Sequence, residues 1–171
     1  IDECIEFMSD LKNYTNIKTS INFFNFSNYS KKDLLNLQKK ITKINSDFIY
    51  FADTHGSMDM LNMNYNFKNF FKYLSKSKKN IGFHFHDNIG TAMSNYIFCK
   101  KNNFKYFDTT INGIGRGGGN LRTEFLLNNK YKENILKFIS DNYNELEVND
   151  LIFYNLTGIL GVSNIYATHA F

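Results

Sequence analysis

The residue types best suited to chemistry lie together in residues 82–90, which read GFHFHDNIG. In a β-strand, side chains two positions apart point to the same face, so His84 and His86 would stand side by side. Phe83 and Phe85 would point to the opposite face, toward an apolar core. Two imidazoles on one face are part of a metal site, and with an oxygen ligand and open positions they suit Mn²⁺, Mg²⁺, Fe²⁺ or Zn²⁺.

A second group of candidate residues is the glycine-rich segment 112–120, which reads NGIGRGGGN. It formally satisfies G-x-G-x-x-G, so a dinucleotide-binding fold is an alternative. That fingerprint belongs to the first strand of such a fold and expects a strand with an acidic residue about 20 positions later. The residues after this segment have a helical pattern instead. We favour a loop that closes over a small anionic substrate, with Arg116 as a carboxylate contact.

The elements that must position these residues alternate along the chain. Apolar residues at helical spacing predict helices near residues 2–11, 30–44, 67–74 and 90–101. Apolar runs predict strands near residues 17–26, 47–53, 80–86 and 104–110. This order indicates a parallel sheet covered by helices, as found in open doubly wound sheets and in (β/α)8 barrels. Beyond it we expect helices at 121–127 and 132–142 and a helical or irregular segment at 150–171.

Polar residues follow three of the predicted strands, namely at 53–57, at 84–88 and at 108–110. Because the carboxyl ends of parallel strands meet at one edge, these residues predict an active site there. Two interpretations of Asp53 remain open: it caps the following turn, or it orients a ligand. We interpret His55 as a loop residue and His169 as exposed.

The composition indicates a globular domain. The chain has 171 residues, of which 43% are hydrophobic and 17% aromatic, enough for a substantial core. The net charge of +4 comes from scattered lysines without a long run of like charges, which argues against a nucleic-acid partner. No segment has the roughly 20 apolar residues that cross a bilayer, so we expect no membrane partner and a cytoplasmic location. Cys4 and Cys99 lack metal-site spacing, and we interpret them as buried free thiols.

Three segments resemble, in order, the motifs of one enzyme family. Residues 53–56 (DTHG) match D-T/S-x-G, residues 82–95 match H-x-H-(D/N)-x-x-G-x-A-x-x-N, and residues 108–124 match D/C-x-(T/S)-x-x-G-x-G-x-x-x-G-N-x-x-x-E. These motifs are those of the metal-dependent aldolase and acyltransferase barrels that include 4-hydroxy-2-oxovalerate aldolase, 3-hydroxy-3-methylglutaryl-CoA lyase, isopropylmalate synthase and homocitrate synthase.

The resemblance implies an α/β fold that is the second half of a (β/α)8 TIM barrel, strands 5 to 8, over residues 1–130, with a helical C-terminal extension at 131–171. It implies that His84 and His86 are metal ligands and that Asp53 and Asn120 are catalytic, Asn120 as a metal or substrate contact and Asp53 in the pocket wall. Gly113, Gly115 and Arg116 would border the substrate. The family's first strand supplies an Arg, a metal-binding Asp and, in aldolases, a catalytic base, none of which is visible here.

The function implied is a divalent-metal-dependent lyase that cleaves a 4-hydroxy-2-oxo acid to pyruvate and an aldehyde, or the reverse, through a metal-stabilised enolate. Mn²⁺ is the first choice of metal, with Mg²⁺ or Zn²⁺ as alternatives. Met58, Asp59 and Met60 are similar to the aldolase branch, whereas Arg116 stands where the synthases carry Glu, and the glycine loop lacks the lyase's Cys. The alternatives are an acetyl-CoA-dependent 2-oxo acid synthase and an inactive or truncated metal-binding half barrel.

The partners expected are a small 2-oxo acid substrate and the missing N-terminal half of the barrel. A half barrel has two open strand edges, which predict aggregation or a homo-oligomer. The catalytic base is not identified, and Tyr154 and Tyr166 are the candidates from the tail.

Overall fold

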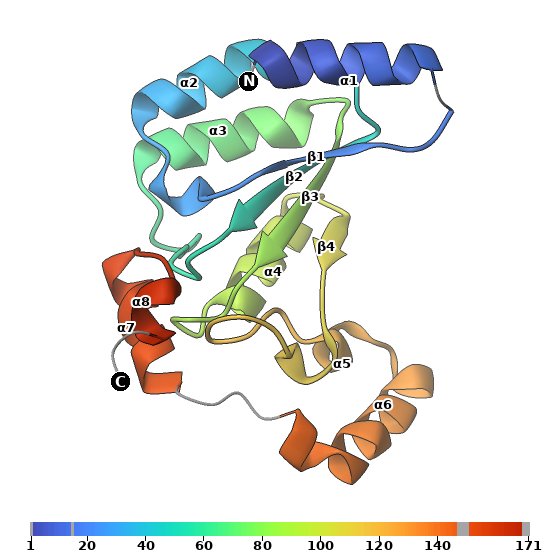
Figure 1. Cartoon of the computed structure of the whole chain (residues 1–171), viewed down its shortest axis with the longest axis vertical. Helices are drawn as coiled ribbons and strands as arrows, with labels where there is room; N and C mark the ends of the chain where they lie inside the picture. The colour runs from blue at the N-terminus through green and yellow to red at the C-terminus, as the bar shows by residue number, and fades with distance from the viewer. Residues whose placement is uncertain (1, 15, 147–150, 169–171) are drawn as a thin grey trace.

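The computed structural model describes residues 2–14, 16–146 and 151–168. Its centre is a parallel sheet whose strands β1 (Ser20–Phe23), β2 (Phe48–Asp53), β3 (Asn80–Phe85) and β4 (Tyr106–Asp108) are neighbours in chain order (Figure 1). This confirms the predicted parallel α/β fold. The strand order never reverses, as it would in an open doubly wound sheet, so the topology is that of a barrel-type sheet.

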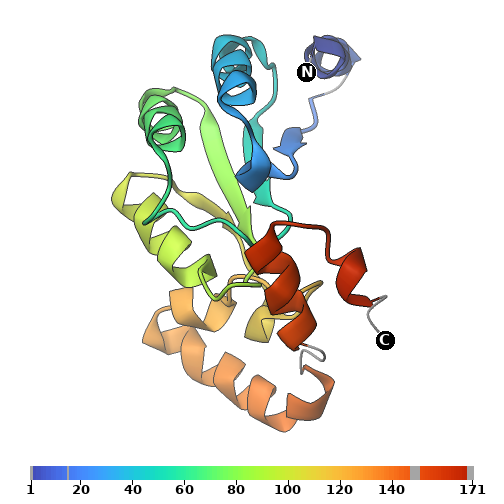
Figure 2. The same ribbon diagram turned by 90° about the vertical axis from the view of Figure 1, so that its left-hand side faces the viewer.

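Three helices connect the strands and cover one face of the sheet: α2 (Lys31–Lys40), α3 (Tyr65–Lys76) and α4 (Ala92–Lys101) (Figures 1 and 2). Ser30 and Asp33 form a capping box that starts α2, and the Asn64 side chain accepts from two backbone N–H groups at the start of α3. Polar residues just before apolar, helix-periodic segments are typical helix starts, and they explain why these helices begin where the sequence predicted. Helix α1 (Asp2–Tyr14) precedes the first strand.

The hydrophobic core lies between these helices and the sheet, and its largest members are phenylalanines. Phe26, Phe51 and Phe83 are almost completely buried, and the ring of Phe83 stacks on that of Phe85 with centroids 5.5 Å apart. Residues with the opposite parity in β2 and β3, such as Tyr50 and His84, therefore face away from the core. This second face carries the candidate chemistry.

The chain after β4 is helical, as predicted. It contains α5 (Thr123–Leu126), α6 (Asn129–Asp141), α7 (Leu151–Leu160) and α8 (Ile165–Thr168), with short 3₁₀ turns at Ile111–Gly113 and Tyr143–Glu145. Two further 3₁₀ turns, Phe26–Asn28 and Ile41–Lys43, lie between β1 and β2. Helices α7 and α8 return to the carboxyl end of the sheet (Figures 1 and 2). The two outer strands are shorter than predicted, because within the described chain each pairs on one side only.

Two further sequence predictions concern single residues. Cys4 and Cys99 are both free, and Cys99 is buried as predicted, but Cys4 is exposed on α1, so that part of the prediction was wrong. His169 lies outside the described residues. Within the part of the chain that the structure describes, no helix is long and apolar enough to cross a membrane.

Candidate metal and substrate site

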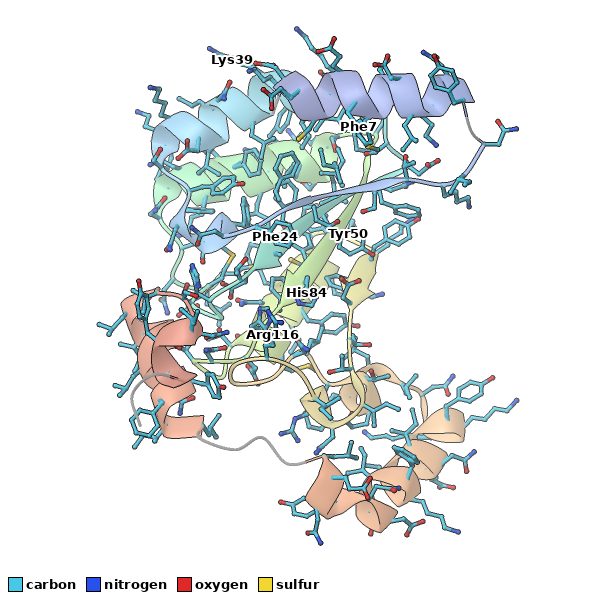
Figure 3. The ribbon with its side chains drawn as sticks, viewed as in Figure 1. Phe7, Phe24, Lys39, Tyr50, His84 and Arg116 are labelled. Atoms are coloured by element: carbon cyan, nitrogen blue, oxygen red, sulfur yellow. The ribbon has the colours of Figure 1, made fainter. Side chains whose placement is uncertain are left out.

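The two histidines of the H-x-H segment lie side by side at the carboxyl end of β3. Phe83 and Phe85, which alternate with them, are 0% and 1% exposed in the core. The rings of His84 and His86 are on the other face, with centroids 4.9 Å apart and nearly perpendicular planes. Figure 3 shows His84 at the same end of the sheet as Arg116.

The orientation of the His86 ring is set by a backbone group. Its Nδ1 lies 2.8 Å from the carbonyl oxygen of Asp53. A carbonyl oxygen can only accept, so Nδ1 carries the hydrogen and, in the neutral ring, Nε2 keeps a lone pair. Burial lowers the pKa of His86, and the nearby His84 and His55 rings act in the same direction. The ring is therefore a neutral donor ligand at neutral pH.

The His84 ring is oriented by a carboxylate. Its Nδ1 lies 3.2 Å from Oδ2 of Asp108, at the end of β4. An ionised carboxylate only accepts hydrogen bonds, so Nε2 of the neutral ring is again left with the lone pair. Metal-bound histidines usually have such an oxygen acceptor on the second nitrogen. Asp108 also lies beside Tyr50, whose pKa is raised by burial and then by the Asp108 charge.

Asp53 uses its side chain within the turn that follows β2. Its carboxyl group is 1% exposed and accepts from the backbone N–H of Ser57 at 3.1 Å and of Met58 at 2.9 Å. Burial raises the pKa of Asp53. Its carboxyl oxygens thus cap the turn, the first of the two interpretations, and its backbone carbonyl oxygen orients the His86 ring. Asp53 is not among the residues that line the cavity at this end of the sheet.

Asn120 lies next to His86, because the end of the glycine loop runs antiparallel to the end of β3. The Asp87 N–H donates to the Gly119 carbonyl at 2.9 Å, and the Leu121 N–H donates to the Phe85 carbonyl at 3.1 Å. The Asn120 amide nitrogen donates to the Ile114 carbonyl across the loop.

The amide oxygen of Asn120, Oδ1, is buried and has no hydrogen-bond partner among the described residues. A buried acceptor without a partner costs about 1–3 kcal/mol. Because Asn120 pairs with His86, Oδ1 is a candidate third donor next to the histidine pair. This donor set fits a divalent cation.

A cavity of about 530 Å³ lies at this end of the sheet. It is lined by residues from five segments that are distant in sequence, Phe24, Ala52, Thr54, His55, His84, His86, Arg116, Gly117, Tyr154, Ser163, Asn164 and Ile165. The structure therefore brings Arg116 together with both histidines in one cavity. Gly113 and Gly115 pack against Asn120 and do not line the cavity. A Cβ on Gly115 would lie 2.1 Å from the Asn120 Nδ2, so the amide needs this glycine.

Sequence reasoning missed two polar residues of the cavity wall, His55 and Asn164, whereas Tyr154, which was considered as a candidate base, does line the cavity. His55 lines the cavity, and its Nδ1 is buried without a hydrogen-bond partner in the described chain. Its place within the DTHG strand end was a usable signal. No sequence signal connected Asn164 with the strand ends, because a tail contact depends on the tertiary fold. Tyr166 is 64% exposed and does not line the cavity.

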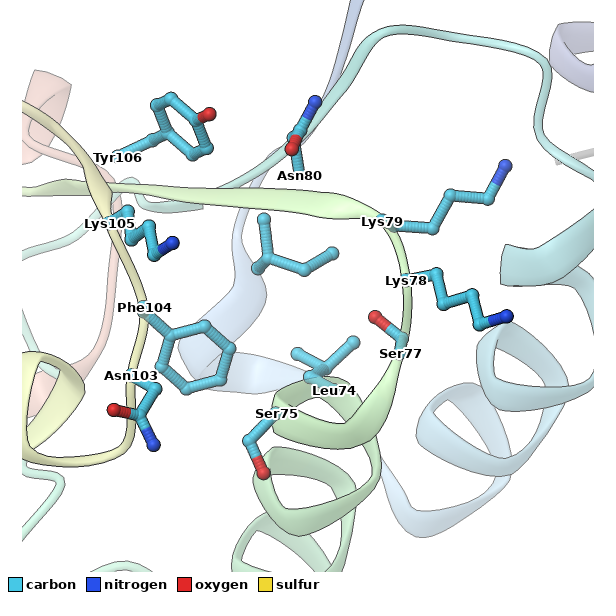
Figure 4. A pocket seen from close by; sticks show the side chains of 11 residues that line it. Leu74, Ser75, Ser77, Lys78, Lys79, Asn80, Asn103, Phe104, Lys105 and Tyr106 are labelled. Atoms are coloured by element: carbon cyan, nitrogen blue, oxygen red, sulfur yellow. The ribbon is translucent and has the colours of Figure 1, made fainter.

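A smaller cavity of about 230 Å³ lies at the opposite, amino ends of β3 and β4 (Figure 4). Lys78, Lys79 and Lys105 are at its rim over an apolar floor that includes Leu74 and Phe104. The Lys79 Nζ already donates to the Ile44 carbonyl at 2.6 Å. This cavity contains no histidine or carboxylate, so the chemistry belongs to the carboxyl end.

The protein side chains described here complete no metal site by themselves. Across residues 2–14, 16–146 and 151–168, no group of three or more His, Cys, Asp or Glu side chains could hold a metal ion. His84 and His86 therefore offer two ligands, and Asn120 offers an amide oxygen as a third donor.

Comparison with known proteins identifies the family of the chain. The family model described as HMGL-like matches residues 1–151. The chain belongs to the HMGL-like family. The glycine loop of this HMGL-like chain follows the last strand and leads into α5, so the dinucleotide-binding alternative finds no support in the described residues.

Curated relatives include a synthase and several aldolases. The chain is 32% identical to homocitrate synthase AksA of Methanocaldococcus jannaschii over 96 residues. These residues make up 56% of this chain and 23% of that protein. It is 29% identical over 94 residues to 4-hydroxy-2-oxovalerate aldolase of Carboxydothermus hydrogenoformans, covering 55% of this chain and 27% of that protein. The chain thus matches about a quarter of the length of these relatives.

Solved structures share the fold over nearly the whole chain. The N-terminal domain of a candidate aldolase from Bacteroides vulgatus superposes with a TM-score of 0.77 at 23% identity, covering 98% of this chain and 58% of that one. The 3-hydroxy-3-methylglutaryl-CoA lyase of Bacillus subtilis gives a TM-score of 0.57 at 17% identity, covering 91% and 53%. At these identities the likeness shows the fold alone.

Proposed function

We propose that this chain forms the metal-binding part of an aldolase that cleaves a 4-hydroxy-2-oxo acid into pyruvate and an aldehyde, or joins them. Curated relatives at about 30% identity include aldolases and a synthase, which supports a carbon–carbon lyase or condensation function in general. The observation that carries the proposal is the pair of oriented imidazoles, His84 and His86, with Asn120 paired to His86 and its amide oxygen without a partner among the described residues.

Enzymes of the HMGL-like family generally use a divalent metal, and the residues present fit one. His84, His86 and Asn120 would hold it, and Mn²⁺ is our first choice, with Mg²⁺ and Zn²⁺ as alternatives. A bound divalent ion would supply positive charge for the negative charge that develops on the 2-oxo group, which lowers the barrier by several kcal/mol. Imidazole binds a metal ion as a neutral ligand, so the two rings would leave the ion its full positive charge.

The chain's own residues would bind and orient the substrate. Arg116 lines the cavity with the histidines, and its guanidinium would pair with the substrate carboxylate through charge-assisted hydrogen bonds. Asp53 and Asp108 fix the two imidazole rings, so the metal ligands need no reorganisation when a substrate arrives. Gly117 also lines the cavity, so the backbone of the glycine loop forms part of its wall.

We further propose that the four strands are strands 5 to 8 of the barrel, with residues 131–171 as a helical extension. The proposal is supported by the unreversed strand order and by the coverage of 58% and 53% of the two solved structures. The remaining strands would cover the face that carries Tyr50 and His84, and they would supply the further metal ligands.

The test is an assay of the full-length protein with Mn²⁺ and 4-hydroxy-2-oxovalerate, in which pyruvate release is followed with a coupled dehydrogenase. We expect metal-dependent pyruvate release that His84→Ala abolishes. The second candidate is an acetyl-CoA-dependent 2-oxo acid synthase, favoured by the match to homocitrate synthase. Release of free thiol from acetyl-CoA with a 2-oxo acid, and no pyruvate, would establish the synthase. A tight metal site with neither activity would indicate an inactive domain.

A further inference from the structure

One buried amide, that of Asn88, connects three segments around the cavity. Asn88 is two residues beyond His86 and is 0% exposed. Its Oδ1 accepts from the Gly118 N–H of the glycine loop at 3.1 Å. Its Nδ2 donates to the tail, to the Tyr154 carbonyl at 2.9 Å and to the Asn164 Oδ1 at 2.7 Å. A backbone N–H on one side and a carbonyl on the other fix the orientation of the amide.

The packing around Asn88 is so close that three segments need glycine there. A Cβ on Gly118 would lie 2.7 Å from the Asn88 Cα, and one on Gly158 of α7 would lie 2.6 Å from its Cβ. A Cβ on Gly56, in the turn after β2, would lie 2.6 Å from its Oδ1. Contacts under 3.0 Å cannot be accommodated without movement. The turn, the glycine loop and α7 therefore meet on this one side chain.

The segments that Asn88 connects are the ones that build the cavity wall. The glycine loop contributes Arg116, and the tail contributes Tyr154 and Asn164. Thr157 strengthens the junction, since its hydroxyl lies 2.8 Å from the Tyr154 carbonyl and 3.1 Å from the Asn164 Oδ1. The part of the cavity wall that the glycine loop and the tail form thus depends on Asn88, which follows His86 by two residues.

We propose that Asn88 is a positioning residue of the candidate active site, which holds α7 and α8 and the glycine loop against the end of β3 so that their side chains reach the substrate. The proposal rests on the proposed function for its substrate. It assigns Asn88 no contact with the reacting atoms.

The substitution Asn88→Asp separates the two halves of this junction. A carboxylate keeps the oxygen that accepts from Gly118, but it places a second oxygen against the Tyr154 carbonyl and the Asn164 Oδ1, which are both acceptors. The Thr157 hydroxyl, 3.3 Å from the amide nitrogen, can donate to a carboxylate, so the tail should be held less tightly rather than released, while the loop stays. Loss of two hydrogen bonds corresponds to about a tenfold rise in KM, with kcat changed less than about threefold.

Asn95→Asp is the matched control. Asn95 is also 0% exposed, and its amide accepts from the Met60 N–H at 2.9 Å and donates to the Met58 carbonyl at 2.7 Å. The same chemical change is thus made in an equally buried amide that does not touch the tail. We expect both variants to lower the thermal midpoint but only Asn88→Asp to raise KM. An equal rise of KM in both variants would show that Asn88 is merely structural and would overturn the proposal.

Hydrogen exchange gives a readout that does not need turnover. In the full-length protein, amide exchange of residues 151–160 should be faster in Asn88→Asp than in Asn95→Asp. Unchanged exchange in Asn88→Asp would refute the positioning role. Absence of turnover in the unsubstituted protein would count against the proposed function only, and the exchange measurement would still decide the role of Asn88.

A second variant covers the case in which Asn88→Asp does not fold. Gly158→Ala leaves the amide intact and favours the helix itself, but its Cβ would push α7 away from Asn88. We expect the same KM rise and the same faster exchange in α7, whereas Ile152→Ala, on the exposed side of α7, should change neither. A Gly158→Ala protein with unaltered KM and exchange would contradict the proposal.

Discussion

The two ends of the sheet differ in whether their polar groups have hydrogen-bond partners within the described chain. At the amino end, the Asp47 carboxylate accepts from the Lys12 ammonium and from the Thr19 N–H, and the Asn80 amide donates to the Asp47 carbonyl. These polar groups serve the fold itself. At the carboxyl end, the imidazoles keep free Nε2 atoms, and the Asn120 oxygen has no partner among the described residues.

The buried polar atoms without partners show the same difference. Across the described chain there are four, of which His55 Nδ1, Thr110 Oγ1 and Asn120 Oδ1 follow strands and only Ser77 Oγ precedes one. Buried polar groups in proteins are normally paired, so each of these atoms can accept a partner such as a ligand or a water molecule. The comparison indicates that stability and function are divided between the two ends, and this division can be tested by substitution.

The largest effect is expected from His86→Ala. Removing one of the two imidazoles should lower pyruvate release in the presence of Mn²⁺ by about a thousandfold, since the charge supplied by the metal is worth several kcal/mol. Mn²⁺ affinity, measured by titration calorimetry, should fall with it. The thermal midpoint of the metal-free protein should change little in comparison.

The counterpart at the amino end is Lys105→Ala, at the rim of the smaller cavity. We expect kcat/KM within about twofold of the unsubstituted value, as for surface substitutions in general. If Lys105→Ala reduced turnover as strongly as His86→Ala, the division between the two ends would be wrong.

Local patterns were sufficient to predict the elements and the histidine pair. The alternation of Phe83 and Phe85 with His84 and His86 fixes which residues enter the core, and the Ser30 and Asn64 caps start helices where the patterns indicated. The carboxyl-end location of the site followed from the parallel sheet alone.

Contacts between distant segments could not be predicted in this way. The sequence does not show that the Asp53 carboxyl group caps a turn while its carbonyl holds His86, because that carbonyl faces the ring only once β2 and β3 are paired. Likewise, Asn164 accepts a hydrogen bond from Asn88 across 76 positions, a contact that holds it at the cavity. These features depend on tertiary packing, for which a single sequence carries no periodic signal.

A smaller effect is expected from Asp108→Asn, which tests how the carboxyl end orients its ligands. The amide keeps an oxygen near His84 Nδ1 but removes the negative charge that makes the ring a better donor. We expect Mn²⁺ affinity to fall about tenfold to hundredfold, with the fold and thermal midpoint preserved. If titration found the Mn²⁺ affinity of Asp108→Asn unchanged, Asp108 would not act through His84.

The smallest effect is expected at the amino end, from Asp47→Asn. The Lys12 ammonium, and then the Thr19 N–H, lower the pKa of Asp47 from its usual 3.8 to about 2. A carboxyl group with a lowered pKa in the folded state stabilises the protein fully above its unfolded pKa, and this contribution is lost as the pH falls through the folded value. Thermal midpoints of the unsubstituted protein should therefore drop between about pH 4 and pH 2.

In Asp47→Asn this contribution to the drop should be absent, and the midpoint at neutral pH should be lower by a few degrees, because the helix α1 loses its ion pair to the sheet. Glu6→Gln is the matched control, since Glu6 is exposed on the same helix without an ion pair in the described part of the chain. Pyruvate release at neutral pH should be the same in both variants. If Asp47→Asn kept the full acid-induced drop of the thermal midpoint, Asp47 would not stabilise the amino end. If Asp47→Asn lost pyruvate release, the two ends of the sheet would be coupled.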